Sequence, residues 1–298
     1  MIFGNFILKS VIKVVGLKER NNTEDIPLIR QKINYWSKFL PQPKNITREQ
    51  IDFKEFHADW LIPDEYESEK VLLYFHGGGY AIRSPKMHTR LVTKLARGAG
   101  LKGFAVYYRL APEHPFPAAI NDAVTAYQYL LDEGYHAENI VVGGDSAGGG
   151  LAVGFSVKLK ELNLPQPAAT ACLSPWADLE GIGASNQEDW RVDGLLSNAR
   201  LQTWGKLYSN GSDLRHPHAS PIYADLSDLP PLLIQVSTDE LLYSDSERLK
   251  DQAEKHNVKV ILRAYPKMVH VWHVWNMLVP EAKTAIQEIA DFYRNALK

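Results

Sequence analysis

Cysteine is almost absent from this chain, and its scarcity limits the chemistry available. The sequence contains a single cysteine, Cys172, so no disulfide can form within the chain. Cys172 lies in an apolar stretch, where a free thiol is usually buried and inert. Because disulfides are rare where thiols are kept reduced, we expect a cytoplasmic protein.

The sequence also lacks an excess of charge of either sign and any long apolar run. It has 33 basic and 35 acidic residues, a formal net charge of -2, and no basic block. This balance argues against a nucleic-acid partner. No apolar run reaches the length of a membrane span. The spacings typical of metal sites, such as paired cysteines or His-x-x-x-His, are missing as well, and we expect no metal and no cofactor.

Residues 1–16 are apolar apart from Lys9 and Lys13 and a few small polar residues. No basic region precedes them and no small-residue cleavage site follows, which argues against a signal peptide. Their apolar residues follow a helical stripe. The pattern predicts an amphipathic helix packed on the protein, and the alternative is a helix lying on a membrane surface.

From residue 51 onward, short apolar runs alternate with amphipathic segments. Strands are predicted at 51–61, 71–75, 103–108, 139–143, 169–173, 231–236 and 258–265, and helices at 89–99, 118–132, 149–162, 244–256 and 280–297. Such alternation is typical of a mostly parallel sheet with helices on both faces. We therefore predict an α/β fold, with one main domain at 51–298.

Two segments break the alternation. Residues 1–50 are predicted to be helical without a strand, and the region around 176–225 is irregular. Ligands of open α/β sheets bind at the carboxyl ends of the strands. We expect residues 1–50 and about 180–220 to form a cap over that edge. Their tryptophans Trp36, Trp190 and Trp204 are candidates to line a substrate pocket, with packing of the cap on the body as the alternative.

One motif points to a nucleophile. Gly-x-Ser-x-Gly occupies residues 144–148, after an apolar strand and before a predicted helix. Glycines on both sides of a serine permit a sharp turn that a Cβ would obstruct. The turn would lift the hydroxyl of Ser146 above the sheet edge. Taken alone, the motif also fits a plain glycine turn or a phosphate-binding loop.

A second glycine run follows the predicted strand 71–75. In His76-Gly77-Gly78-Gly79, backbone N–H groups can turn toward a pocket and stabilise a developing oxyanion. We expect these donors to be Gly77 and Gly78, joined by Ala147, the residue after the serine.

A serine nucleophile requires a general base and an acid that orients it. His270 follows the last predicted strand and is preferred as the base over His273, three residues later. Asp239 and Glu240 follow the strand before it, and only one of two adjacent side chains can point at the histidine. The order serine, acid, histidine is that of α/β-hydrolases.

These motifs resemble those of the hormone-sensitive-lipase-like esterases, the bacterial family IV carboxylesterases. Residues 76–79 are similar to the family's HGGG motif, 144–149 to its GDSAGG elbow, and 108–119 to the segment between them. The resemblance runs from Val71 to the C-terminus. It implies an α/β-hydrolase fold with a helical cap, short- to medium-chain ester substrates and, as in many members, a homodimer.

At the acid, this chain departs from the family pattern. The family commonly has Asp-Pro-Leu there, and no proline follows either candidate. Alignment back from His270 favours Glu240, and alignment forward from the strand favours Asp239. Glu240 is slightly preferred and both are kept.

The sequence therefore predicts a serine carboxylesterase that works through an acyl-enzyme. Ser146 would attack the ester carbonyl while His270 accepts the serine proton. One alternative is an amidase or acyltransferase with the same triad. Another is a small-molecule receptor built on an inactive hydrolase fold.

Overall fold

The structure is a computed structural model that describes residues 25–67, 69–187 and 196–298. Its strands are β1 (Ile46–Asp52), β2 (His57–Pro63), β3 (Val71–Phe75), β4 (Lys102–Tyr107), β5 (Ile140–Asp145), β6 (Ala169–Leu173), β7 (Leu232–Ser237) and β8 (Val260–Tyr265). Its α-helices are α2 (Ile26–Ser37), α3 (Pro85–Ala99), α4 (Ala118–Asp132), α5 (Ala147–Glu161), α6 (Asn198–Ser209), α7 (Tyr243–Lys255) and α8 (Pro280–Ala296).

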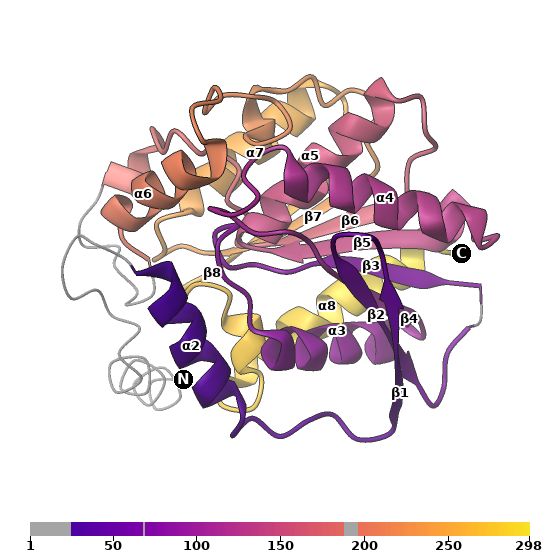
Figure 1. Ribbon diagram of the computed structural model, residues 1–298. Helices are drawn as coiled ribbons and strands as arrows, with labels where there is room; N and C mark the ends of the chain where they lie inside the picture. Colours follow the sequence, from indigo (N-terminus) through magenta and orange to yellow (C-terminus); the bar gives the residue numbers. More distant parts are fainter. Residues whose placement is uncertain (1–24, 68, 188–195) are drawn as a thin grey trace.

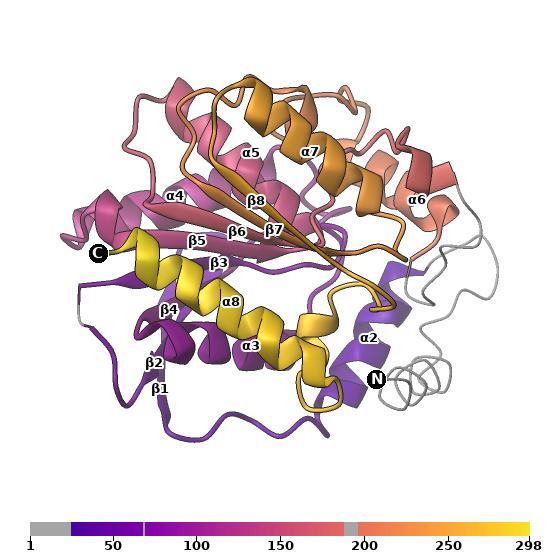
Figure 2. The same ribbon diagram turned by 180° about the vertical axis from the view of Figure 1, so that it is seen from behind.

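The strands form one eight-stranded sheet in the order β1-β2-β4-β3-β5-β6-β7-β8. β1 and β2 pair antiparallel, as do β2 and β4, and all later pairs are parallel. Helices α4, α5 and α7 cover one face and α3 and α8 the other (Figure 1). Seen from behind, α3 and α8 lie side by side (Figure 2). The predicted fold class is confirmed.

The central strands lie between two layers of helices, and the sequences of these strands are accordingly apolar. Every residue of β3, β5 and β6 is buried. A strand covered on both faces needs apolar side chains at successive positions, which is why these strands appear as continuous apolar runs. The predicted helix 118–132 has the same bounds as α4, and Gly100 ends α3 in the left-handed conformation, at φ 74°.

The prediction that no strand precedes residue 50 is wrong. β1 begins at Ile46 and pairs with β2, so the predicted strand 51–61 comprises the end of β1, a turn, and most of β2. β1 is an edge strand, and most of its residues are exposed. Its sequence, Ile-Thr-Arg-Glu-Gln-Ile-Asp, is accordingly polar. A polar edge strand carries little of the apolar pattern on which strand prediction depends.

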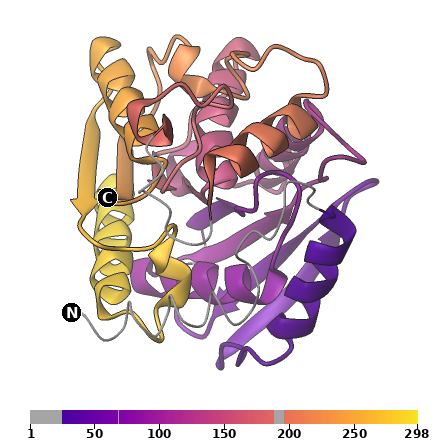
Figure 3. The ribbon, with the colours of Figure 1, turned by 90° about the vertical axis from the view of Figure 1, so that its left-hand side faces the viewer.

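Helices α2 and α6 lie at one end of the sheet (Figure 3). Ile33 of α2 and Trp204 of α6 line the same cavity as Ser146, at the carboxyl end of β5. The helix predicted at 1–16 falls outside the described residues. Within the three described ranges, no helix is both long enough and apolar enough to cross a membrane.

Gly154 in α5 offers a test of how closely this helix packs. A Cβ at Gly154 would lie 2.2 Å from the carbonyl oxygen of His218. Alanine favours a helix over glycine by about 1 kcal/mol, but overpacking costs up to about 3 kcal/mol, and a 2.2 Å approach to backbone belongs in the range of about 2–3 kcal/mol. We expect Gly154→Ala to lower the free energy of unfolding by about 1–2 kcal/mol, measured by chemical denaturation. Lys158→Ala, one turn later and partly exposed, should change it by less than about 0.5 kcal/mol. A Gly154→Ala protein as stable as wild type would contradict the contact.

Candidate active site

Ser146 occupies a strained turn between β5 and α5. Its backbone angles are φ 53° and ψ -121°, a region that residues with a side chain rarely adopt. A Cβ on Gly144 would lie 2.1 Å from the oxygen of Gly148, and one on Gly148 would lie 2.1 Å from the oxygen of Phe75. Only glycine fits both positions. The turn is held in place because the Ser146 N–H donates to the carbonyl oxygen of Leu173, at 2.8 Å.

His270 and Glu240 form a short hydrogen bond. Nδ1 of His270 lies 2.7 Å from Oε2 of Glu240. The Glu240 side chain is completely buried, and its other oxygen accepts from the Ser174 hydroxyl at 2.7 Å and the Ser237 N–H at 2.8 Å. A carboxylate only accepts, so Nδ1 carries the proton, and Nε2 is left as the basic nitrogen of the imidazole.

The neighbouring acid, Asp239, points elsewhere. It is partly exposed, its Oδ1 accepts from the Thr238 hydroxyl at 2.7 Å, and its N–H donates to Ser237 Oγ at 3.2 Å. The structure thus brings His270 together with Glu240 and not with Asp239.

Two other histidines near the site are enclosed in the core. His273 is fully buried, with Nε2 2.8 Å from Oε1 of Gln235, and burial lowers its pKa to about 3. His76 is also buried, with Nδ1 2.8 Å from the oxygen of Gly77, and burial lowers its pKa to about 3 as well. Both imidazoles are neutral at ordinary pH, and neither lines the cavity beside Ser146.

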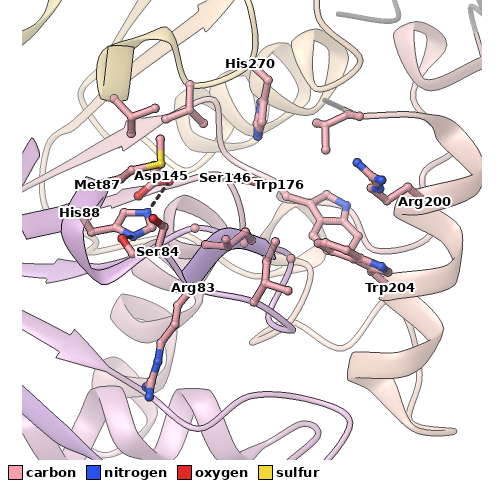
Figure 4. A pocket seen from close by; sticks show the side chains of 18 of the residues that line it. Arg83, Ser84, Met87, His88, Asp145, Ser146, Trp176, Arg200, Trp204 and His270 are labelled. Carbon is pink, nitrogen blue, oxygen red and sulfur yellow. Dashed lines mark hydrogen bonds and ion pairs between the residues drawn. The ribbon is translucent and has the colours of Figure 1, made fainter. Parts of the chain in front are cut away.

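Ser146 and His270 face a common cavity of about 210 Å³. Figure 4 shows His270 on one side of it, near Ser146, and the rings of Trp176 and Trp204 on another. Gly77 and Gly78, two of the three predicted oxyanion donors, belong to its wall. Ala147, the third, is the first residue of α5 and is not among the described residues that line the cavity.

The three predicted pocket tryptophans have different positions. Trp204 lines the cavity. Trp36 lies outside it, 42% exposed, with its ring beside Tyr35 and Phe39. In α2 it is Ile33 that lines the cavity, and Trp36 lies on an exposed side of the helix. Trp190 falls outside the described residues.

Trp176 and Trp275 line the cavity although they were not among the predicted residues. Their positions in the sequence offered a signal. Trp176 closely follows β6, and Trp275 closely follows His270, so both come after strands that end at this edge.

Asp145 lies below the glycine loop. Its Oδ1 accepts from the Tyr74 hydroxyl at 2.9 Å, and its Oδ2 is 3.4 Å from His88 Nε2. Burial works to raise the pKa of Asp145, but the His88 imidazole and the Tyr74 hydroxyl outweigh it, and the pKa is lowered. A Cβ on Gly77 would lie 2.2 Å from Oδ2, so the loop packs directly on this carboxylate. Asp145 therefore supports the loop and faces His88, not His270.

Two further features concern the single cysteine and the residue types that bind metals. Cys172 is buried, which raises the pKa of its thiol to about 12 and keeps it protonated. Within the parts of the chain that the structure describes, no three His, Cys, Asp or Glu side chains converge as a metal site.

Comparison with known proteins relates this chain to α/β-hydrolases and esterases. A family model described as an alpha/beta hydrolase fold matches residues 72–274. An acetyl-hydrolase of Streptomyces hygroscopicus is 43% identical over 239 residues, which cover 80% of each chain. An esterase of Acinetobacter venetianus is 36% identical over 233 residues, 78% of this chain and 77% of its own.

Solved structures resemble this one over almost their whole length. An esterase from the bacterial hormone-sensitive lipase family superposes with a TM-score of 0.93 at 36% identity, covering 99% of this chain and 98% of that one. EstE5, in crystals soaked with p-nitrophenyl butyrate, superposes with a TM-score of 0.93 at 34% identity, covering 100% of this chain and 99% of its own.

Burial of His273 predicts a contribution to acid sensitivity. Its pKa in the folded protein, about 3, is below the ordinary value of 6.5, so the unfolded chain binds the proton first as the pH falls. The stability it contributes is complete above about pH 6.5 and is lost between there and about pH 3. When the pH is lowered from 7 to 5, we expect the free energy of unfolding to fall by about 1–2 kcal/mol more in wild type than in His273→Gln.

Urea denaturation at the two pH values measures this difference. His136→Gln, at an exposed histidine, controls for the loss of one imidazole. The same loss of stability in wild type and His273→Gln would mean that His273 takes up its proton as readily in the folded protein as in the unfolded one.

Proposed function

Since this chain belongs to the α/β-hydrolase family, among its hormone-sensitive-lipase-like esterases, we propose that it hydrolyses short-chain carboxylic esters through Ser146, His270 and Glu240. The observation that carries the proposal is the 2.7 Å hydrogen bond between His270 and a fully buried Glu240, at the cavity that Ser146 also lines. A histidine oriented in this way beside a serine in a strained turn is the arrangement that activates a hydroxyl.

In the proposed mechanism, Oγ of Ser146 attacks the ester carbonyl as Nε2 of His270 takes its proton. Glu240 keeps the imidazole in the required tautomer and stabilises the imidazolium. The N–H groups of Gly77, Gly78 and Ala147 donate to the oxyanion of the tetrahedral intermediate. His270 then protonates the departing alcohol. Water, deprotonated by the same histidine, releases the acid from the acyl-enzyme.

The size and walls of the cavity support a short acyl group. At about 210 Å³ it is smaller than the sites that hold drug-sized ligands. Trp176, Trp204 and Leu201 give it apolar walls, which suit a hydrocarbon chain. A relative named acetyl-hydrolase and a similar structure soaked with p-nitrophenyl butyrate support the same range. We propose acetyl to butyryl esters as preferred substrates, at the short end of the range predicted from sequence.

Three further features belong to this proposal. The cap comprises α2 and α6, supported by Ile33 and Trp204 in the cavity wall. The cytoplasmic location is supported by the single, buried Cys172. The homodimer is supported by the family resemblance alone.

Removal of the nucleophile tests the proposed function directly. Hydrolysis of p-nitrophenyl esters from acetyl to palmitoyl is compared between wild type and Ser146→Ala. We expect turnover of the short esters only, and a fall of about 10⁴-fold or more in kcat for the mutant, because no other group replaces the serine. No turnover by a folded wild type would contradict the esterase proposal, and equal activity in the mutant would contradict the role of Ser146.

The two adjacent acids provide a matched pair of variants. Glu240→Gln keeps the shape but removes the charge that stabilises the imidazolium, and we expect kcat to fall by about 10³–10⁴-fold. Asp239→Asn makes the same change one residue earlier, where the side chain faces Thr238. We expect it to stay within about twofold of wild type. Thermal melting checks that both fold. If kcat fell more in Asp239→Asn than in Glu240→Gln, Asp239 and not Glu240 would be the acid that orients His270.

A further inference from the structure

A second cavity, of about 380 Å³, lies beside the loop that follows β3. Arg83 belongs to the walls of both cavities. In Figure 4 its side chain extends away from Ser146 and His270. The second cavity is also lined by Arg30 of α2 and Arg109, which follows β4. The guanidinium of Arg83 is therefore directed away from the proposed ester site.

Two of the three arginines in this cavity have carboxylate partners. Arg30 pairs with Glu113 at 2.7 Å. Arg109 pairs with the buried Asp122 at 2.7 Å and with Glu55 at 2.6 Å. The side chains of Glu55 and Glu113 are 54% and 51% exposed, so these carboxylates lie toward solvent and are already paired.

Arg83 differs from both neighbours. In the described part of the chain, no carboxylate oxygen lies within 4.0 Å of its guanidinium, and no protein group accepts a hydrogen bond from it. Its cation lies over the ring of Tyr107, 5.7 Å from the centroid. Burial lowers the pKa of Arg83, as is expected for a desolvated cation that lacks a counterion.

A partly desolvated guanidinium that has no carboxylate partner among the described residues is a costly arrangement, and an anion from solution would relieve it. Its planar set of N–H groups matches the two oxygens of a carboxylate. The cavity wall also includes the partly exposed Phe56 and Leu110, which offer apolar surface. A ligand with a charged end and a short hydrocarbon tail satisfies both parts of the wall.

We propose that the second cavity binds a small monocarboxylate, with its carboxylate paired to Arg83 and its tail against the apolar wall. The site is separate from the ester cavity but touches the same loop. Nε of Arg30 donates to the carbonyl oxygen of Ala81 at 2.9 Å. The N–H of Ala81 in turn donates to the carbonyl oxygen of Gly78 at 3.1 Å. A ligand there would lie against the loop that carries the predicted oxyanion donors.

Isothermal titration calorimetry of the full chain with sodium butyrate, at constant ionic strength, tests this site. We expect saturable binding that Arg83→Met weakens at least about tenfold, because the methionine keeps bulk and loses the charged fork. Arg83→Lys keeps the charge without the planar fork and should weaken it less. Arg90→Met is the matched control, since Arg90 on α3 donates to the carbonyl of Pro41 and lines neither cavity.

Three results would overturn the proposal. The first is no binding of butyrate to wild type. The second is unchanged binding by a folded Arg83→Met, which would place the carboxylate elsewhere, for example beside Ser146. The third is binding of phosphate or of neutral butyramide at least as tight as that of butyrate, which would rule out a monocarboxylate site. Thermal melting checks that both Arg83 variants fold. Density against Arg83 in butyrate-soaked crystals would support the site.

Discussion

The close backbone contacts around Ser146 are the constraint on which this site depends. Gly144 and Gly148 approach each other and the end of β3 so closely that no side chain fits at either position. This packing keeps Ser146 in a conformation that would otherwise relax, because backbone strain persists only where the surroundings enforce it. The same contact joins the serine turn to the strand that precedes the glycine loop. Ser146 and the predicted oxyanion donors are therefore held by one closely packed junction between β3 and β5.

The buried Glu240 joins three further segments to that junction. Its carboxylate accepts from Ser174 after β6 and from Ser237 at the end of β7, and it contacts His270 after β8. A buried carboxylate is tolerated only where its oxygens have hydrogen-bond partners. Each partner comes from the carboxyl end of a different strand, so the acid is oriented by the sheet itself. This explains how a site on loops can be held precisely.

The loop after β3 separates two environments. On one side it faces a cavity with apolar walls, next to Ser146 and His270. On the other it faces a polar cavity in which Arg30 and Arg109 pair with carboxylates, whereas Arg83 pairs with no carboxylate of the described residues. Arg30 also donates to the carbonyl oxygen of Ala81, so a residue that lines the second cavity is bonded directly to this loop.

Much of this arrangement was predictable from sequence, because it depends on patterns among residues that are neighbours in the chain. The buried parallel strands appear as apolar runs, and Gly-x-Ser-x-Gly after such a run indicates the strained turn. The order serine, acid, histidine follows from where the strands end. β1 was missed because an exposed edge strand has no apolar face to leave a pattern.

The sequence preferred His270 to His273 and, slightly, Glu240 to Asp239, but only the tertiary structure showed that His270 and Glu240 meet. It alone separated Trp204 from Trp36. In each pair the two residues share a type or a charge, and what differs is the place to which the fold directs the side chain. The cluster of Arg83 with Arg30 and Arg109 was equally hidden, since the three arginines come from distant parts of the chain. Residue type and spacing determine which chemistry is available, whereas the packing of distant segments decides which side chains meet.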